Sequence, residues 1–198
     1  MKTATTKVHS GSNGATAEHQ QVSLQPLERS HLTAEYLSWL NDPEVTRYME
    51  TGTFPTTAED LERFFRSVTG SREQVAFAIV HKESGKHIGN VKLGPIHWVH
   101  RGATLGIMIG DKKFWGQGLG EDATRLAVEY GFYRLNLRRI DLGVFAEHEP
   151  AVRCYEKVGF RIEGRCREAL FHCGEYKDRL WMGLLRSEYE SARAGKKQ

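Results

Sequence analysis

The sequence predicts a single α+β domain built on a mixed, mainly antiparallel sheet. Several short apolar runs have the two-residue period of strands, and others repeat apolar side chains every three or four residues, as helices do. The predicted order is strand, two helices, three strands, helix, strand, helix and two strands, which lacks the strict alternation of a doubly wound sheet. At 198 residues, of which 39% are hydrophobic, the chain is long enough for one domain with a substantial core.

We expect this domain to occupy residues 22–185 between two polar ends. Residues 1–21 are rich in Thr, Ser, Gly and Ala and hold almost no large apolar side chains, so burial cannot offset the entropy of ordering them. They are therefore predicted to be a flexible N-terminal tail. Residues 186–198 are charged and are predicted to form a solvated C-terminal tail.

The first half of the domain is predicted to be one strand followed by helices. Apolar and polar residues alternate over residues 22–27, and a helix is expected over residues 31–40. A short helical segment is expected over residues 44–49, and a further helix is capped by Thr56 or Thr57. The buried stripe of that helix is predicted to consist of Leu61, Phe64, Phe65 and Val68.

The second half is predicted to begin with a meander and to end with an antiparallel pair. Strands over residues 75–81 and 87–96 flank a hairpin turn, and a third strand covers residues 103–109. The remaining predicted elements are a helix from Leu119 to Tyr133, a strand over 139–146, a short helix from Pro150 to Gly159, and strands over 160–171 and 175–184.

The stretch from residue 113 to residue 123 joins an apolar strand to an amphipathic helix through Gly116, Gly118 and Gly120. Glycine has no Cβ, so the backbone there can take positive φ and its N–H groups can converge on an anion. The N-terminus of the following helix adds free N–H groups and the positive end of its dipole. The loop is therefore predicted to bind a phosphate group.

A dinucleotide-binding site is an alternative interpretation of the same glycines. Gly118, Gly120 and Ala123 satisfy its fingerprint, and Asp141 lies about twenty residues further on. However, the glycines come past mid-chain after a long connection, and Asp141 lies early in its predicted strand rather than at the end. No Gly-Lys-Ser/Thr sequence is present, so a nucleoside triphosphate loop is not predicted either.

Composition argues against several other classes of protein. The net charge is only +3 and no basic stripe with interleaved aromatic residues stands out, so no nucleic-acid partner is expected. No apolar run is long enough to span a bilayer or to act as a secretory signal, so we expect a cytoplasmic protein without a membrane partner. The three cysteines lack CxxC spacing and the nine histidines are scattered, so neither a disulfide framework nor a metal site is predicted.

Two motifs give the chain a family resemblance. The stretch from Trp115 to Gly120 (WGQGLG) and the stretch from Ala151 to Phe160 (AVRCYEKVGF), taken with the order of elements, resemble the GCN5-related N-acetyltransferases. The likeness covers residues 22–185 and is greatest to the branch of ribosomal-protein, spermidine and amino-sugar-nucleotide N-acetyltransferases. It implies a sheet whose central strands splay apart to hold acetyl-CoA as co-substrate, with no metal.

The resemblance also implies where acetyl-CoA binds. Its pyrophosphate would lie on the glycine loop, and its pantetheine arm, which carries two amides, would pair like an added strand with an exposed strand edge. The predicted cofactor-binding residues are Met108, Ile109, Trp115, Gly116, Gln117, Gly118, Leu119, Gly120, His148 and Lys157.

Tyr155 is the predicted catalytic residue. When an amine attacks the thioester, the departing thiolate needs a proton, and a phenol within hydrogen-bond reach can supply it. In similar enzymes the tyrosine of this motif is positioned to do so during direct transfer, without an acyl-enzyme. Relatives commonly have Asn at the position of His148 and often a glutamate where this chain has Thr104 and Leu105, so the sequence leaves the general base open.

The predicted acceptor is a primary amine on an amino sugar or sugar nucleotide. Residues 36–50 resemble the acceptor region of enzymes acting on such nucleotides, and Trp39, Arg47 and Tyr48 suit a sugar ring and an anion. A protein N-terminus and a polyamine are alternatives. A non-catalytic acetyl-CoA-binding sensor is an alternative of another class, because His148 and Ala151 depart from the family pattern and the strand glutamate is missing. The sequence also leaves the oligomeric state open, a homodimer included.

Overall fold

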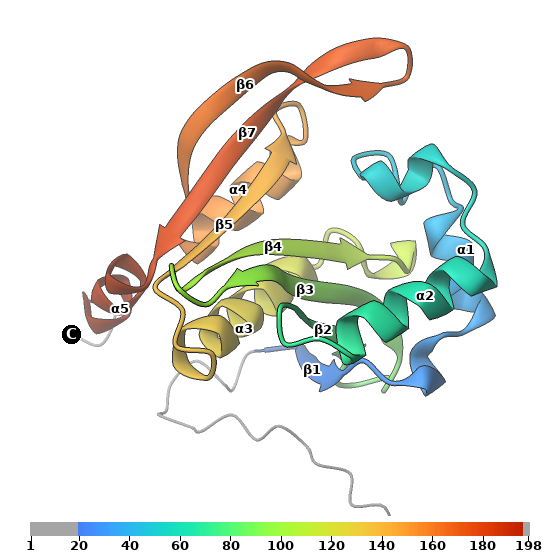
Figure 1. Cartoon of the computed structure of the whole chain (residues 1–198), viewed down its shortest axis with the longest axis horizontal. Coiled ribbons are helices and arrows are strands. Elements are labelled where there is room, and N and C mark those ends of the chain that lie inside the picture. Colours follow the sequence, from blue (N-terminus) through green and yellow to red (C-terminus); the bar gives the residue numbers. More distant parts are fainter. Residues whose placement is uncertain (1–19, 196–198) are drawn as a thin grey trace, which may run out of the picture.

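The computed structural model describes residues 20–195, which build one seven-stranded sheet with helices on both faces (Figure 1). Across the sheet the strands lie in the order β1-β2-β3-β4-β5-β7-β6. The strands are β1 Val22–Pro26, β2 Val75–His81, β3 His87–His97, β4 Gly102–Ile109, β5 Arg139–Phe145, β6 Arg161–His172 and β7 Glu175–Leu185. The α-helices are α1 Ala34–Leu40, α2 Ala58–Thr69, α3 Leu119–Tyr133, α4 Glu149–Val158 and α5 Arg186–Gly195, with short 3-10 segments at Arg29–His31, Glu50–Thr53 and Lys112–Phe114. The predicted α+β class and mainly antiparallel sheet are confirmed.

The parallel pair β4 and β5 interrupts an otherwise antiparallel sheet. These strands are paired only between residues 102–104 and residues 139–141. Beyond this point β4 continues along β3 to Ile109 and β5 continues along β7 to Phe145, so the two strands diverge (Figure 1). The edge of β4 that faces β5 is therefore unpaired over its second half, which confirms the predicted splayed pair.

Different helices cover the two faces of the sheet, and the side-chain alternation of β2 explains this arrangement. Phe77 faces α3 and packs edge-on against Tyr130, with 4.8 Å between the ring centroids. Ala76 and Ala78 point to the opposite face, where they join a cluster with Val68 of α2. Because successive side chains of a strand point to opposite faces, one strand supports both layers.

Local sequence sets the ends of the helices that border the site. Thr57 accepts a hydrogen bond from the backbone N–H of Asp60, and the Asp60 carboxylate accepts one from the backbone N–H of Thr57, which forms a capping box at the start of α2. Gly118 precedes α3 at φ 78° and Gly159 ends α4 at φ 117°. Both values lie in the left-handed region that favours glycine. Pro150 lies in the first turn of α4, where its missing N–H costs no helical hydrogen bond.

The segment between α1 and α2 differs from the prediction. Residues 44–49 form turns rather than the expected helical segment. The N–H of Thr46 donates to the carbonyl of Asp42, and the N–H of Met49 donates to the carbonyl of Thr46, but no continuous ladder follows. Isolated turns of this kind do not propagate into a helix because too few hydrogen bonds offset the ordering entropy.

The two predicted tails also have different outcomes. Residues 186–195 form α5 instead of a solvated tail, because Tyr189 is only 3% exposed and packs against Phe132. The predicted N-terminal tail falls almost entirely on residues 1–19, which lie outside the described residues. Within residues 20–195, no helix is long and apolar enough to cross a membrane.

Candidate active site

A cavity of about 1220 Å³ lies where β4 and β5 diverge. Its walls come from the second half of β4, the glycine loop before α3, helix α4 with the loop that precedes it, and the segment of α1 and α2 with their connection. A cavity of this size is large enough to hold the arm of a cofactor together with a small acceptor.

The glycine loop forms the wall at the N-terminus of α3. Gly116 and Gly118 have φ values of 74° and 78°, and a Cβ atom built at either position would meet no other atom within 4 Å. The residue before α3 provides no side-chain cap, so the first N–H groups of the helix remain directed toward the loop. This geometry suits an anion, as the sequence predicts.

The unpaired edge of β4 forms a second wall. Beyond Thr104, the backbone groups of β4 that face β5 have no partner strand, and residues 105–109 line the cavity. Trp115 covers the end of this edge, since its indole N–H donates to the carbonyl of Ile109 at 2.8 Å. An extended chain with amide groups can pair with such an edge.

Tyr155 enters the cavity from α4 and is half-buried there. Its ring packs edge-on against Phe160, with 6.0 Å between the centroids. Burial raises the pKa of the Tyr155 phenol well above its usual value, so the phenol keeps its proton at neutral pH and can act as an acid. Burial also raises the pKa of the neighbouring Cys154 to about 11, which leaves that thiol a poor nucleophile at neutral pH.

His148 lies in the loop just before α4 and lines the same cavity. Its ring stacks on Tyr48, with centroids 4.2 Å apart and planes 19° apart. Burial, and then the nearby Arg47 guanidinium, lower the pKa of His148 below its usual value. The imidazole is therefore neutral at pH 7 and has a free lone pair.

The carboxylates that line the cavity are all engaged by cations. Glu44 pairs with Lys112 at 2.8 Å, and Glu121 pairs with Arg125 at 2.9 Å. Asp60 completes the cap of α2 and also pairs with a neighbouring arginine at 2.8 Å. Within residues 20–195, no group of three or more His, Cys, Asp or Glu side chains is arranged to hold a metal ion.

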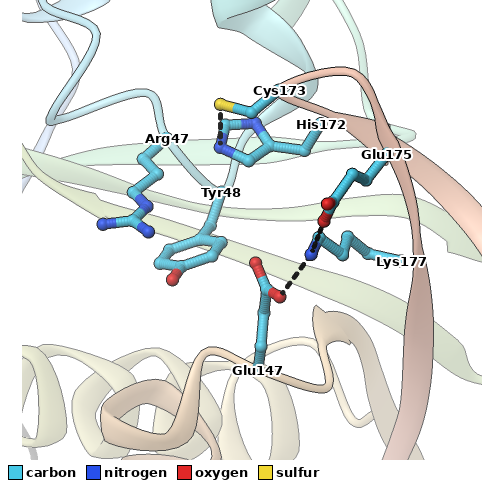
Figure 2. Close-up of a pocket in the computed structure, with 7 residues that line it drawn as sticks. All are labelled: Arg47, Tyr48, Glu147, His172, Cys173, Glu175 and Lys177. Atoms are coloured by element: carbon cyan, nitrogen blue, oxygen red, sulfur yellow. Dashed lines mark hydrogen bonds and ion pairs between the residues drawn. The ribbon is translucent and has the colours of Figure 1, made fainter.

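A smaller cavity of about 460 Å³ adjoins the first through Arg47 and Tyr48, which line both (Figure 2). The β6–β7 hairpin supplies most of its other wall. There the ammonium of Lys177 lies between the carboxylates of Glu147 and Glu175 (Figure 2). The seven lining residues are Arg47, Tyr48, Glu147, His172, Cys173, Glu175 and Lys177.

The structure brings most of the predicted site residues together. Met108, Ile109, Trp115, Gly116, Gly118, Leu119, Gly120, His148, Tyr155, Lys157, Arg47 and Tyr48 all line the large cavity. Gln117 is not in its wall, because its side-chain amide donates to the carbonyl of Lys113 at 2.8 Å. Trp39 is not in the wall either. It is 6% exposed and packs so closely on Gly110 that a Cβ there would lie 2.2 Å from the indole.

Sequence reasoning missed the contribution of the β6–β7 hairpin. His172 and Lys177 reach Tyr48 and Glu147 only because the hairpin folds back over residues more than a hundred positions away, or over the end of β5. One local signal for this wall is the group of charged and aromatic residues around the turn of the hairpin, because binding residues often lie on loops that a rigid scaffold positions.

Comparisons with known proteins agree with this geometry. Residues 21–161 match the family model described as an acetyltransferase (GNAT) domain. The chain is 32% identical to a spermidine N(1)-acetyltransferase of Escherichia coli over 169 residues, which is 85% of this chain and 88% of that protein. It is 31% identical to a putative ribosomal N-acetyltransferase of Bacillus subtilis over 54% of this chain and 57% of that protein.

Solved structures give the same result. The crystal structure of a spermidine N-acetyltransferase from Vibrio cholerae, in complex with CoA and spermine, superimposes with a TM-score of 0.79. The two sequences are 30% identical, and the superposition covers 86% of this chain and 98% of the other.

Proposed function

The chain belongs to the acetyltransferase (GNAT) family, and on this premise we propose that the amine it acetylates is a primary amine of a polyamine. The enzyme is an N-acetyltransferase that uses acetyl-CoA as co-substrate. The observation that carries the choice of acceptor is the likeness, over 85% of this chain, to a protein named as a spermidine N(1)-acetyltransferase. This likeness favours the polyamine alternative over the amino sugar that the sequence predicts.

Acetyl-CoA would bind along the glycine loop and β4. The N–H groups of residues 116–120 and the N-terminus of α3 suit the pyrophosphate, because no Cβ or side-chain cap obstructs them. The unpaired edge of β4 suits the two amides of pantetheine. Lys157, which is exposed and 3.9 Å from a Glu121 oxygen, is a further cation within the cavity wall for a cofactor phosphate.

Tyr155 would act as the general acid in a direct transfer. The attacking nitrogen forms its bond to the thioester carbonyl carbon, the C–S bond breaks, and the phenol gives its proton to the sulfur. Its raised pKa keeps the phenol protonated before the reaction, and its place on α4 opposite the glycine loop brings it to the cavity that would hold the thioester. A covalent acyl-enzyme on Cys154 is disfavoured because burial keeps that thiol protonated.

The polyamine would enter beside α1 and α2. Glu44 and Asp60 in this wall already bind Lys112 and Arg63, but both carboxylates are partly exposed and can share a further ammonium. Glu147 and Glu175 add two carboxylates just beyond Tyr48 in the smaller cavity (Figure 2).

Arg47 supports a second candidate, the amino-sugar nucleotide. Its guanidinium lies 5.3 Å from the centre of the Tyr48 ring, and no carboxylate among residues 20–195 forms an ion pair with it. An unpaired arginine next to an aromatic ring suits a sugar diphosphate and repels a polycation. A protein N-terminus remains a third acceptor to test.

The test measures thiol release from acetyl-CoA with spermidine, spermine, a nucleotide-linked amino sugar and a short peptide with a free N-terminus. We expect turnover with the polyamines and at least tenfold lower kcat/KM with the other two. Turnover with the sugar nucleotide alone would overturn the polyamine proposal in favour of the second candidate. If no thiol is released with any of these amines, although calorimetry shows that the protein binds acetyl-CoA, the sensor alternative is favoured.

A further inference from the structure

We propose that His148 is the base that takes the proton from the attacking amine. This inference rests on the proposed function, because it concerns the same amine transfer. It assigns a group to a step for which this chain lacks the glutamate that relatives often carry, since Thr104 and Leu105 occupy that place.

The other bases in the cavity wall are already committed. Glu44 and Glu121 are held in ion pairs with Lys112 and Arg125 at 2.8 and 2.9 Å. Asp60 accepts hydrogen bonds from both the backbone and the hydroxyl of Thr57. The hydrogen bonds from Thr57 lower the pKa of Asp60, which makes its carboxylate a weak base, and the carboxylates of Glu44 and Glu121 are occupied by their cationic partners.

His148 has no such commitment. Among residues 20–195, none forms a hydrogen bond with either ring nitrogen. The ring stacks on Tyr48, with 4.2 Å between centroids, and stacking uses the faces of a ring rather than its edge. Both nitrogens therefore stay in the plane of a fixed ring and keep their hydrogen-bonding capacity.

The position of His148 fits a role between acceptor and cofactor. Tyr48 and Arg47 on one side belong to the segment predicted to bind the acceptor, whereas α4 on the other side carries Tyr155. The ring thus lies at the junction of the acceptor wall and the helix of the predicted acid. A base and an acid at such a junction can serve opposite ends of the same transfer.

The surroundings keep His148 neutral. Burial and the charge of Arg47 lower the pKa of His148, so the imidazole holds a lone pair down to a lower pH than a solvated histidine does. The titratable and charged groups that the hairpin, α4 and the loops on either side of the stack place in the two cavity walls include Arg47, Tyr48, Glu147, Arg153, Cys154, Tyr155, Lys157, His172, Cys173, Glu175 and Lys177. Lys177 forms ion pairs with both Glu147 and Glu175.

The amine gives up two protons during the transfer, and His148 takes part in both steps. A polyamine ammonium first loses one proton through His148 to solvent. As the neutral nitrogen bonds to the carbonyl carbon it becomes far more acidic, so a weak base such as imidazole can take its second proton. The C–S bond breaks and Tyr155 gives its proton to sulfur. Transfer of the proton on His148 through solvent to the Tyr155 phenolate then restores both groups.

The test compares His148→Asn with the wild type, because asparagine retains hydrogen-bonding groups but does not titrate. We measure kcat/KM for spermidine from pH 5.5 to 9.5, and KM for acetyl-CoA at each pH. We expect a loss of about 10²-fold near pH 7, the usual contribution of a general base, with KM for acetyl-CoA within about twofold of the wild-type value. The loss should shrink toward pH 9.5, where more of the amine is already deprotonated, and added imidazole should restore part of the rate at pH 7.

His100→Asn is the matched control, since this histidine is exposed in the turn between β3 and β4 and lines neither cavity. It should keep the wild-type pH profile. A pH-independent loss in His148→Asn, or a loss confined to KM for acetyl-CoA, would overturn the proposal and leave His148 as a cofactor contact. Wild-type rates in His148→Asn would overturn it as well.

The choice of amine separates this proposal from the function on which it rests. If the wild type does not acetylate polyamines but acetylates the sugar nucleotide or the peptide, the polyamine proposal fails. The same pH series is then run with the amine that is acetylated. An acceptor amine with a pKa near 8 should show a smaller His148→Asn loss than spermidine does, because it needs less help to lose its proton. Absence of turnover with any amine would overturn both.

Discussion

The wall of the cavity proposed to bind acetyl-CoA, called the donor side, and the wall proposed to bind the amine, called the acceptor side, are built in different ways. The donor side consists of a short loop, one strand edge, the start of α3 and helix α4, with Gly116 to Gly120 and Tyr155 inside two contiguous motifs. The acceptor side consists of turns over residues 44–49 and a hairpin, held together by ion pairs and ring contacts. The donor side therefore depends on backbone geometry, whereas the acceptor side depends on side chains that can be substituted without a change in the fold.

The difference explains how one fold can serve several acceptors. A glycine loop and a strand edge bind a ligand through their backbone N–H and C=O groups. Larger side chains next to these groups would obstruct the cofactor, so few substitutions are compatible with binding. Residues on turns and hairpins can change without disturbing the core. We therefore expect substitutions on the donor side to affect every acceptor equally, and substitutions on the acceptor side to change selectivity.

The largest effect is expected for Tyr155→Phe on the donor side. Removal of the phenol proton should lower kcat about 10²-fold or more for every accepted amine, since a general acid contributes that much. Tyr133→Phe on α3 is the matched control, because Tyr133 is 47% exposed and lies outside the cavity wall. Steady-state kinetics on both variants checks this, and a loss below about tenfold for Tyr155→Phe would remove Tyr155 as the acid.

The next effect is expected for Gly118→Ala. At φ 78° an alanine is strained, so the free energy of unfolding should fall by about 1 to 2 kcal/mol even though its Cβ meets no atom within 4 Å. Gly120→Ala tests the explanation, since Gly120 lies inside α3, where its added Cβ would be 3.9 Å from Ile109. Urea unfolding should show no loss for Gly120→Ala; equal losses in the two variants would contradict the account of the loop.

A smaller effect is expected for Thr57→Ala on the acceptor side. Loss of the cap of α2 should lower the free energy of unfolding by about 1 kcal/mol. Because Asp60 then also loses its hydroxyl partner, KM for the amine should change while KM for acetyl-CoA does not. Thr57→Ser should retain both the stability and the kinetics, and a rise in KM for acetyl-CoA would break the separation of the two sides.

The smallest effect is expected for Arg47→Gln. Removal of a cation near the cavity should lower KM for spermidine by about threefold at low salt, and the gain should fade as salt screens the repulsion. Arg72→Gln, outside the cavity wall, should have no effect. The direction of the change distinguishes the two candidate acceptors. Loss of the Arg47 charge should raise KM for an anionic sugar nucleotide, whereas a rise in KM for spermidine would contradict the polyamine proposal.

Sequence reasoning predicts the donor side well because its signals are local. The glycines between the apolar strand and the amphipathic helix predict the loop, and the motif around Tyr155 predicts α4. The apolar run of β2 and the turn residues after His81 likewise predict the hairpin that connects β2 to β3. Each of these features depends on residues close together in the chain.

The acceptor side is predictable only in part because its contacts are long-range. The stack of Tyr48 on His148 joins residues a hundred positions apart, and no local pattern specifies it. Trp39 illustrates the opposite error: an aromatic residue with a suitable character for a ligand packs on Gly110 in the core instead. The packing of Tyr189 on Phe132 similarly turns an apparently solvated tail into α5.

In the proposed reaction, one acetyl group passes directly from acetyl-CoA to a polyamine. The measurement that tests it most directly is mass spectrometry of all products after a reaction with isotope-labelled acetyl-CoA and spermidine. We expect the label to appear as a single acetyl group on spermidine, with one free CoA thiol per acetyl group and unmodified protein. Label retained on the protein, or thiol release without acetylated spermidine, would contradict it.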